Sequence, residues 1–144
     1  MKLSSLLASA ALSVVLTGSA LADAKVLKFG HVGAPGSLFE ASANEFASCA
    51  NKNLAGKVEV QTFGSSQLGK DKELLQRLKL GHVDFSLPSS VMSSVADEFG
   101  VFEMPYIIGD REHMKRVEGA ILESKLQPAV KKKGYRILAV WENG

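Results

Sequence analysis

The sequence predicts an α/β fold with a doubly wound, mostly parallel sheet. Segments with strand-like alternation and segments with helical periodicity follow one another in the order β-α-β-α-β, then an irregular stretch, then α-β. Glycines bound most of these segments, as expected where short loops join strands to helices. Strands that alternate with helices pair in parallel, because each helix carries the chain back across a face of the sheet.

The first half of the chain predicts two strands and the helix between them. The segment 25–33 alternates and is rich in strand-forming residues, and it ends at the turn GAPGS. The segment 57–63 alternates Val58, Val60 and Thr62 with polar residues, which predicts a second strand. Between them, a helix over 38–51 is predicted by apolar residues at helical spacing, which are Phe39, Ala43, Phe46, Ala47 and Ala50.

The second half continues the alternation. Leu74, Leu75 and Leu78 predict the inward face of a second helix that ends at Gly81, and 82–88 predicts a third strand closed by Pro88. The run 98–110 is apolar but broken by glycine and proline, so we expect an irregular packed segment with short strands. A long helical face over 114–130, weakly interrupted around Ser124, stops at Gly134, and 135–141 predicts a further strand.

The first 22 residues predict a secretory signal peptide. Lys2 is followed by an apolar run and by Ala20-Leu21-Ala22, an A-x-A cleavage site. We therefore expect cleavage after Ala22 and a mature chain, 23–144, in the periplasm. The formal net charge of +2 falls by one when Lys2 is removed, and such a near-neutral chain argues against a nucleic-acid partner. The run 131–133 (KKK) precedes Gly134, which is typical of the end of a helix rather than of a binding patch.

The single cysteine, Cys49, excludes a disulfide within the chain. No histidine or acidic residue stands near it in the sequence to suggest a nucleophile. We expect a small, buried or half-buried side chain.

Three loops follow the predicted strands and define the edge where a ligand would bind. In doubly wound sheets ligands bind beyond the carboxyl ends of the strands. The loops are 31–37 (HVGAPGS), 64–71 (GSSQLGKD) and 88–90 (PSS). Glycines in such loops also occur simply because tight turns require them. The second loop is not a phosphate-binding P-loop, because Gly69-Lys70 is followed by Asp71 instead of serine or threonine.

The residue types of a hydrolase are present, but their spacing is not. Ser66 lies in Gly64-Ser65-Ser66-Gln67-Leu68, which lacks the G-x-S-x-G elbow. No pair of histidines or carboxylates has the spacing of metal ligands, and no cofactor is expected. Two alternatives to a binding protein stay open: a small exported α/β hydrolase that uses Ser66 and a histidine, and a scaffold or interaction domain.

Four stretches in order carry a resemblance to a known family. They are LKFGHV, then VEV..F.SSQLG.D.ELL..LK.G.VDF, then VFEMPYII.D, then KGYRILAVWENG. They resemble the periplasmic solute-binding proteins of tripartite ATP-independent periplasmic (TRAP) transporters, of the dicarboxylate-binding type. The resemblance covers almost all of 23–144. It implies a non-enzymatic, two-lobed protein that closes around a small-molecule carboxylate and delivers this organic acid to the membrane permease subunits of the transporter.

The resemblance also implies which residues face the ligand. Asp71 occupies the position of an acid that accepts hydrogen bonds from ligand hydroxyls. The sialic-acid-binding members carry glutamate and arginine where this chain has Ser89 and Met92, so the resemblance disfavours sialate. Other residues at the strand ends match positions that line the cleft, or that begin the crossover to the second lobe, in this family. With them, the predicted ligand-binding set is His31, Asp71, Ser89, Ser90 and Trp141.

One departure from the family pattern is large. Family members are more than twice this long, so the resemblance implies that 23–144 is the N-terminal lobe alone, ending before the second lobe. The arginine that pairs with the ligand carboxylate belongs to the other lobe in this family. We therefore expect this lobe by itself not to serve as a receptor, 135–141 to lack a neighbouring strand, and the apolar surface around Val101, Phe102 and Tyr106 to favour association.

Overall fold

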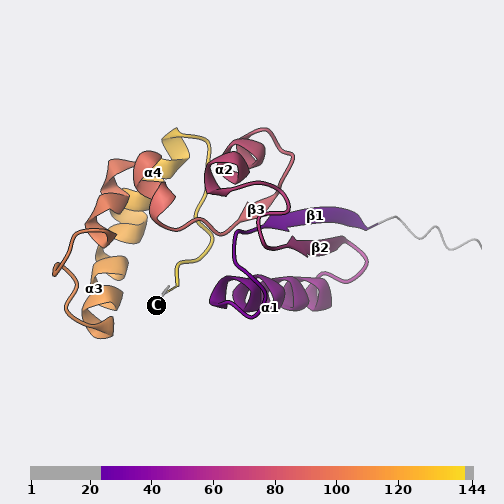
Figure 1. The fold of residues 1–144 in the computed structure, drawn as a ribbon, viewed down its shortest axis with the longest axis horizontal. Coiled ribbons are helices and arrows are strands. Elements are labelled where there is room, and N and C mark those ends of the chain that lie inside the picture. Colours follow the sequence, from indigo (N-terminus) through magenta and orange to yellow (C-terminus); the bar gives the residue numbers. More distant parts are fainter. Residues whose placement is uncertain (1–23, 142–144) are drawn as a thin grey trace, which may run out of the picture.

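The computed structural model describes residues 24–141 as an α/β unit (Figure 1). Its three strands are β1 (Lys25–Gly30), β2 (Val58–Phe63) and β3 (Phe85–Ser86), all parallel, in the order β2-β1-β3. Helices α1 (Leu38–Asn53) and α2 (Asp71–Lys79) lie on opposite sides of this sheet. The predicted fold class is confirmed.

Helix α1 covers one face of the sheet. It begins at Ser37, whose hydroxyl accepts a hydrogen bond from the Glu40 amide at 3.3 Å and so caps the first turn. Ala43 and Ala47 are buried against Phe29 and Val60 of the two longer strands. Small residues on this face of α1 allow the helix to lie close to the larger side chains of the sheet.

Helix α2 covers the other face through Leu74 and Leu75, which are buried as predicted. Leu74 approaches the end of β1 so closely that a Cβ on Gly30 would lie 2.6 Å from its Cδ2 atom, so a larger residue at this position would force the buried Leu74 side chain to shift. The helix ends before Gly81, which has the positive φ of +74° that glycine adopts without strain.

The third strand is shorter than the sequence predicts. Only Phe85 and Ser86 pair with β1, while the predicted start of this strand at His82 lies in an exposed turn. Two 3-10 helices follow, over Ser90–Ser94 and Asp97–Phe102. The segment 98–110 is irregular, as predicted, but within the described chain it contains no strand.

The predicted long helix is present in three pieces. α3 (Arg111–Ile121) runs into a π-helical turn, η3 (Leu122–Leu126), and then into α4 (Gln127–Lys132). Pro128 lacks the amide hydrogen that would donate to the preceding turn, which explains why the regular helix is interrupted just before it. Within residues 24–141, no helix is long and apolar enough to cross a membrane.

The prediction of a strand over 135–141 is wrong. This segment, yellow in Figure 1, runs beside α2 without pairing with any strand of the described chain. Its backbone is held by side chains instead: the Gln127 amide donates to the Ile137 carbonyl at 2.9 Å and accepts from the Ile137 amide at 3.0 Å. The Tyr135 hydroxyl donates to the Leu75 carbonyl at 3.0 Å. The sequence has strand propensity here, but a strand requires a neighbouring strand.

A similar amide interaction covers the outer edge of β2. Asn51, near the end of α1, donates to the Val60 carbonyl at 3.0 Å and accepts from the Val60 amide at 2.6 Å. Both groups would otherwise face outward, because β2 is an edge strand.

The expectation for Cys49 is wrong, because its side chain is exposed. The Asn53 amide donates to the Cys49 carbonyl at 2.7 Å and approaches its sulfur at 3.3 Å. Helical periodicity places Cys49 beside Ala50 and Asn53, away from the face that Ala43 and Ala47 bury.

Candidate functional site

The loops that follow β1 and β2 are joined by backbone hydrogen bonds at the carboxyl edge of the sheet. The Ser65 amide donates to the Gly33 carbonyl at 2.9 Å, and the Ser66 amide donates to the His31 carbonyl at 3.2 Å. The His31 amide in turn donates to the Phe63 carbonyl at 3.0 Å. These bonds continue the pairing of the two strands beyond the sheet and fix the two loops relative to one another.

The second loop has a strained backbone. Ser65 and Ser66 have φ values of +50° and +60°, and Gly69 has a φ of +109°. A left-handed conformation costs a residue with a side chain about 1 to 2 kcal/mol. Two consecutive residues of this kind persist only where the surroundings enforce them, which is typical of binding loops.

His31 lies inside this pair of loops. It is 1% exposed, and its ring is packed between two glycines: a Cβ on Gly64 would lie 2.8 Å from its Cε1 atom, and one on Gly33 would lie 3.2 Å from its Nδ1 atom. The Nδ1 atom has no hydrogen-bond partner. Burial lowers the pKa of His31, and the negative charge of Glu40 opposes this effect. The ring is therefore a neutral imidazole near neutral pH, and its side chain supports the loops from within.

Asp71 is the first residue of α2 and closes the second loop. Its Oδ1 atom is buried and has no hydrogen-bond partner. Burial raises the pKa of this carboxyl group. An oxygen with unused acceptor capacity at the carboxyl edge of the sheet can accept a hydrogen bond from a hydroxyl group, and such a bond would compensate for its desolvation.

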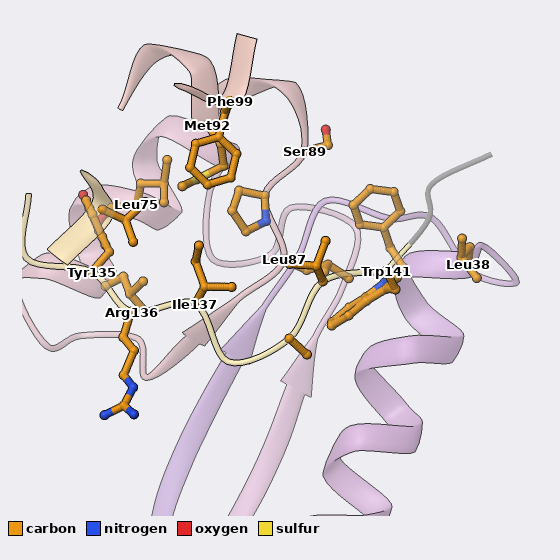
Figure 2. Close-up of a pocket in the computed structure, with 16 residues that line it drawn as sticks. Leu38, Leu75, Leu87, Ser89, Met92, Phe99, Tyr135, Arg136, Ile137 and Trp141 are labelled. Carbon is orange, nitrogen blue, oxygen red and sulfur yellow. The ribbon is translucent and has the colours of Figure 1, made fainter. Parts of the chain in front are cut away.

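Ser89 and Trp141 line a second feature, an apolar cavity of about 210 Å³ between the sheet edge, α2 and the segment 135–141 (Figure 2). Figure 2 shows Trp141 beside Leu87, and Ser89 at the rim. Ser90 lies outside this lining, exposed at the start of a 3-10 helix. The cavity is otherwise lined mainly by apolar residues, which are Leu38, Phe39, Leu75, Leu78, Leu87, Pro88, Met92, Phe99, Val130, Tyr135, Ile137, Ala139 and Val140.

Among the described residues that line this cavity, Arg136 is the only one with a charged side chain. Its guanidinium group points away from Met92 and Phe99 in Figure 2, and the residue is exposed. The other three arginines of the chain, Arg77, Arg111 and Arg116, are also exposed. The cavity of this chain therefore offers apolar contacts and one serine hydroxyl to a ligand. Residues 24–141 contain no group of three histidine, cysteine or acidic side chains placed to hold a metal ion.

The structure thus divides the five predicted site residues. Ser89 and Trp141 share the apolar cavity, His31 lies within the joined loops, and Asp71 ends the second loop. Sequence reasoning missed the apolar lining. Phe39 belongs to the predicted inward face of the helix over 38–51, and Leu87 to the predicted strand over 82–88. Only their positions directly beside predicted loops could have indicated a role in a cavity.

Comparison with known proteins identifies the family. The family model for bacterial extracellular solute-binding proteins, family 7 (DctP), matches residues 29–144. The chain is 39% identical over 148 residues to the C4-dicarboxylate-binding periplasmic protein DctP of Rhodobacter capsulatus, a match that covers 99% of this chain and 43% of that protein. It is 33% identical over 125 residues to the C4-dicarboxylate-binding protein DctB of Bacillus subtilis, covering 86% of this chain and 36% of the relative.

Solved structures of similar proteins agree with this family assignment. A TRAP periplasmic solute-binding protein from Sulfurospirillum deleyianum with bound succinate superimposes with a TM-score of 0.69 at 33% identity, over 76% of this chain and 36% of that one. Another from Pseudomonas aeruginosa with bound L-malate gives a TM-score of 0.76 at 28% identity, over 83% and 42%. The chain spans less than half the length of these relatives. With the resemblance to TRAP solute-binding proteins confirmed, the chain belongs to family 7 of the bacterial extracellular solute-binding proteins.

Proposed function

We propose that this chain forms part of a TRAP solute-binding protein that captures an organic acid in the periplasm and delivers it to the permease subunits of the transporter. The observation that carries the proposal is the family match over residues 29–144, together with the joined and strained loops at the carboxyl edge of the sheet. The proposed ligand class is a four-carbon dicarboxylate or a similar carboxylate. Two of the matched relatives carry C4-dicarboxylate binding in their names, and two matched structures contain succinate and L-malate.

Within this proposal the five predicted site residues have distinct tasks. Asp71 accepts a hydrogen bond from a ligand hydroxyl, and the Ser89 and Ser90 hydroxyls offer further polar contacts. Trp141 provides a flat apolar surface beside the ligand. His31 positions the two loops from within, because its side chain is buried. Only the edge of its ring could reach the ligand.

The proposal also assigns no catalysis to the chain. The alternative of a hydrolase would need the Ser66 hydroxyl to be hydrogen-bonded to a histidine. Within residues 24–141, Ser66 contacts His31 through its backbone amide, and its hydroxyl forms no hydrogen bond with a histidine or a carboxylate. No observation therefore favours Ser66 as a nucleophile.

Calorimetry on the protein as its gene encodes it tests the proposal. The panel contains succinate, L-malate, fumarate and D-glucuronate, and short-chain aryl esters are assayed in parallel for turnover. Saturable binding of a dicarboxylate without ester hydrolysis is the expected result. Ester turnover that Ser66→Ala abolishes would replace the binding role with a hydrolase, and the absence of heat with every acid would remove the proposed ligand class.

Export is part of the proposal. The predicted signal peptide, residues 1–22, lies outside the described residues, so the structure does not bear on it. Mass spectrometry of the protein recovered from the periplasm should find Asp23 at the amino terminus. A chain that retains Lys2, or that stays in the cytoplasm, would contradict the proposed location.

A further inference from the structure

The carboxyl ends of α2 and α4 meet at one place on the surface. Lys79, the last residue of α2, has its Cε atom 3.8 Å from the position that a Cβ on Gly134 would occupy, just after α4. The hydrogen bond from Tyr135 to Leu75 joins the same two segments. The last turns of the two helices and the residues just after them carry six exposed cations, which we call the basic patch: Arg77, Lys79, Lys131, Lys132, Lys133 and Arg136.

Within the described residues, the charge of the basic patch is only partly compensated. None of its six members forms an ion pair within 4.0 Å in the part of the chain that the structure describes. Asp97 and Glu98 line a small hollow together with Lys132 and Lys133 and reduce the local charge. Two carboxylates beside six cations leave an excess of positive charge.

The ends of the two helices explain only part of this cluster. Cations in the last turn of a helix are stabilised by its dipole, which accounts for Arg77, Lys79, Lys131 and Lys132. Lys133 is the C-cap residue of α4 and is still within reach of this effect, whereas Arg136 lies beyond it. The predicted helix-end position of the lysine run is therefore confirmed, and a surface role of the same lysines is a separate proposal.

An exposed aliphatic side chain lies at the same helix end. Leu80, directly after Lys79, is 70% exposed. Its backbone closes α2, because its amide donates to the Gln76 carbonyl at 3.0 Å, which fixes the position of its Cα atom at the helix end. An exposed leucine next to several cations is a combination that a membrane surface recognises, since the cations face headgroups and the leucine enters the boundary with the acyl chains.

We propose that the basic patch, with Leu80, docks on anionic phospholipid headgroups. A cluster of four to eight lysines and arginines on one surface is typical of proteins that bind acidic lipids. The centres of protein interfaces, in contrast, are enriched in aromatic residues, and the large exposed apolar residues nearest to the patch in sequence are two leucines, Leu80 and, two residues after Arg136, Leu138. The proposal rests on the export part of the proposed function, and it is independent of the ligand.

Co-sedimentation with vesicles tests the proposal on the protein as its gene encodes it. One set of vesicles is equimolar phosphatidylglycerol and phosphatidylcholine, and the other is phosphatidylcholine alone. We expect binding to the first set only, weakening as salt is raised, because salt screens exposed charges. Each cation removed should lower the partition coefficient about fivefold.

Matched variants locate the surface. R77Q/K79Q and K131Q/K132Q/K133Q remove cations from the basic patch, while K70Q/K72Q removes two from the opposite end of α2 as a control. We expect the first two to lose binding and the control to keep it, with Leu80→Ser showing an intermediate loss. Circular dichroism checks that each variant is folded.

Three outcomes would overturn the proposal. They are equal binding to both sets of vesicles, equal losses in K70Q/K72Q and R77Q/K79Q, and no binding to lipid at low salt. The last outcome, combined with binding to membranes that contain the transporter's permease, would assign the patch to a protein partner. Loss of ligand binding with intact vesicle binding would contradict only the proposed ligand, so the two failures are distinguishable.

Discussion

Three buried side-chain atoms of the described chain lack a hydrogen-bond partner: His31 Nδ1, Asp71 Oδ1 and Ser86 Oγ. Such atoms are uncommon, because each costs the chain its lost hydration. Two of the three belong to the loops at the carboxyl edge of the sheet, and the third belongs to β3 directly beside them. The unsatisfied polar groups thus gather where the proposed ligand would bind, and each is open to a direct test.

Asp71→Ala should weaken the binding of L-malate more than the binding of succinate, because the two acids differ by the hydroxyl that Asp71 is proposed to bind. Loss of a hydrogen bond to a charged group corresponds to about 1.5 to 3 kcal/mol, or about tenfold or more in Kd for L-malate. Calorimetric titration of both ligands measures the difference. Glu59→Ala, on the exposed face of β2, is the control and should change neither Kd. Equal losses for the two acids would remove Asp71 from the site.

His31 should make stability depend on pH in one direction. Because burial lowers its pKa, the unfolded chain takes up a proton as the pH falls through 6.5 while the folded chain does not. The contribution of His31 is therefore complete above pH 6.5 and is lost progressively below it. Thermal unfolding between about pH 7 and pH 5 should show a smaller loss of stability for His31→Leu than for the parent protein. The same loss of stability on acidification in His31→Leu and in the parent protein would reject this assignment.

At the scale of elements, side-chain amides replace missing strand partners. Gln127 pairs with both backbone groups of Ile137, and Asn51 does the same for Val60. A primary amide presents a donor and an acceptor with the same spacing as a peptide group. Ile137 in the segment 135–141 and Val60 at the edge of β2 therefore have partners for their backbone groups without an adjacent strand.

Gln127→Ala should free the segment 135–141. The Ile137 amide and carbonyl would lose their partners, which costs about 1 to 3 kcal/mol if they stay buried, so the segment should instead open to water. Hydrogen exchange measured by mass spectrometry should become faster in peptides that contain 135–141 and stay unchanged in those from β1. Gln76→Ala, exposed on α2, is the matched control. Unchanged protection at 135–141 would show that apolar packing alone holds the segment.

The residue pattern within each segment predicted most helices and strands of the fold, because such a pattern depends only on which face of the segment is buried. The helical spacing of Ala43 and Ala47 and the alternation of Val58 and Val60 each follow from one face being buried. The segment 135–141 is rich in strand-forming residues, but whether it pairs depends on a neighbour that no local pattern specifies. β3 is short for a similar reason, since only two of its residues meet β1.

At the scale of the whole molecule, the chain has one edge with joined polar loops and an apolar cavity beside it. The ends of the predicted strands placed His31, Asp71 and Ser89 at that edge, and this part of the site was predictable from the sequence. Trp141 was predicted there as the end of a strand over 135–141 that the structure does not contain. The separation of these residues between the joined loops and the apolar cavity was not predictable. His31 is enclosed because Gly33 and Gly64 leave room for its ring, and Trp141 reaches the cavity because of how 135–141 crosses α2.

Trp141 should report ligand binding. It is the only tryptophan of the sequence, it is 40% exposed, and it lines the apolar cavity. A carboxylate that displaces water from this cavity should change its fluorescence in proportion to occupancy. Titration of the protein as encoded with succinate, compared with Trp141→Phe, isolates the signal of this residue. The same spectral change in both proteins would place the ligand away from Trp141.

The position of Asn51 has a consequence for how molecules of this protein meet at high concentration. An open sheet can grow by accepting a strand from a neighbouring molecule, and β2 offers the longer of the two outer edges. Asn51 occupies the hydrogen-bonding groups of Val60, in the middle of that edge, so an incoming strand would have to displace it. One side chain at the end of α1 thereby opposes the addition of a foreign strand at the middle of β2, which is the first step of fibrous assembly.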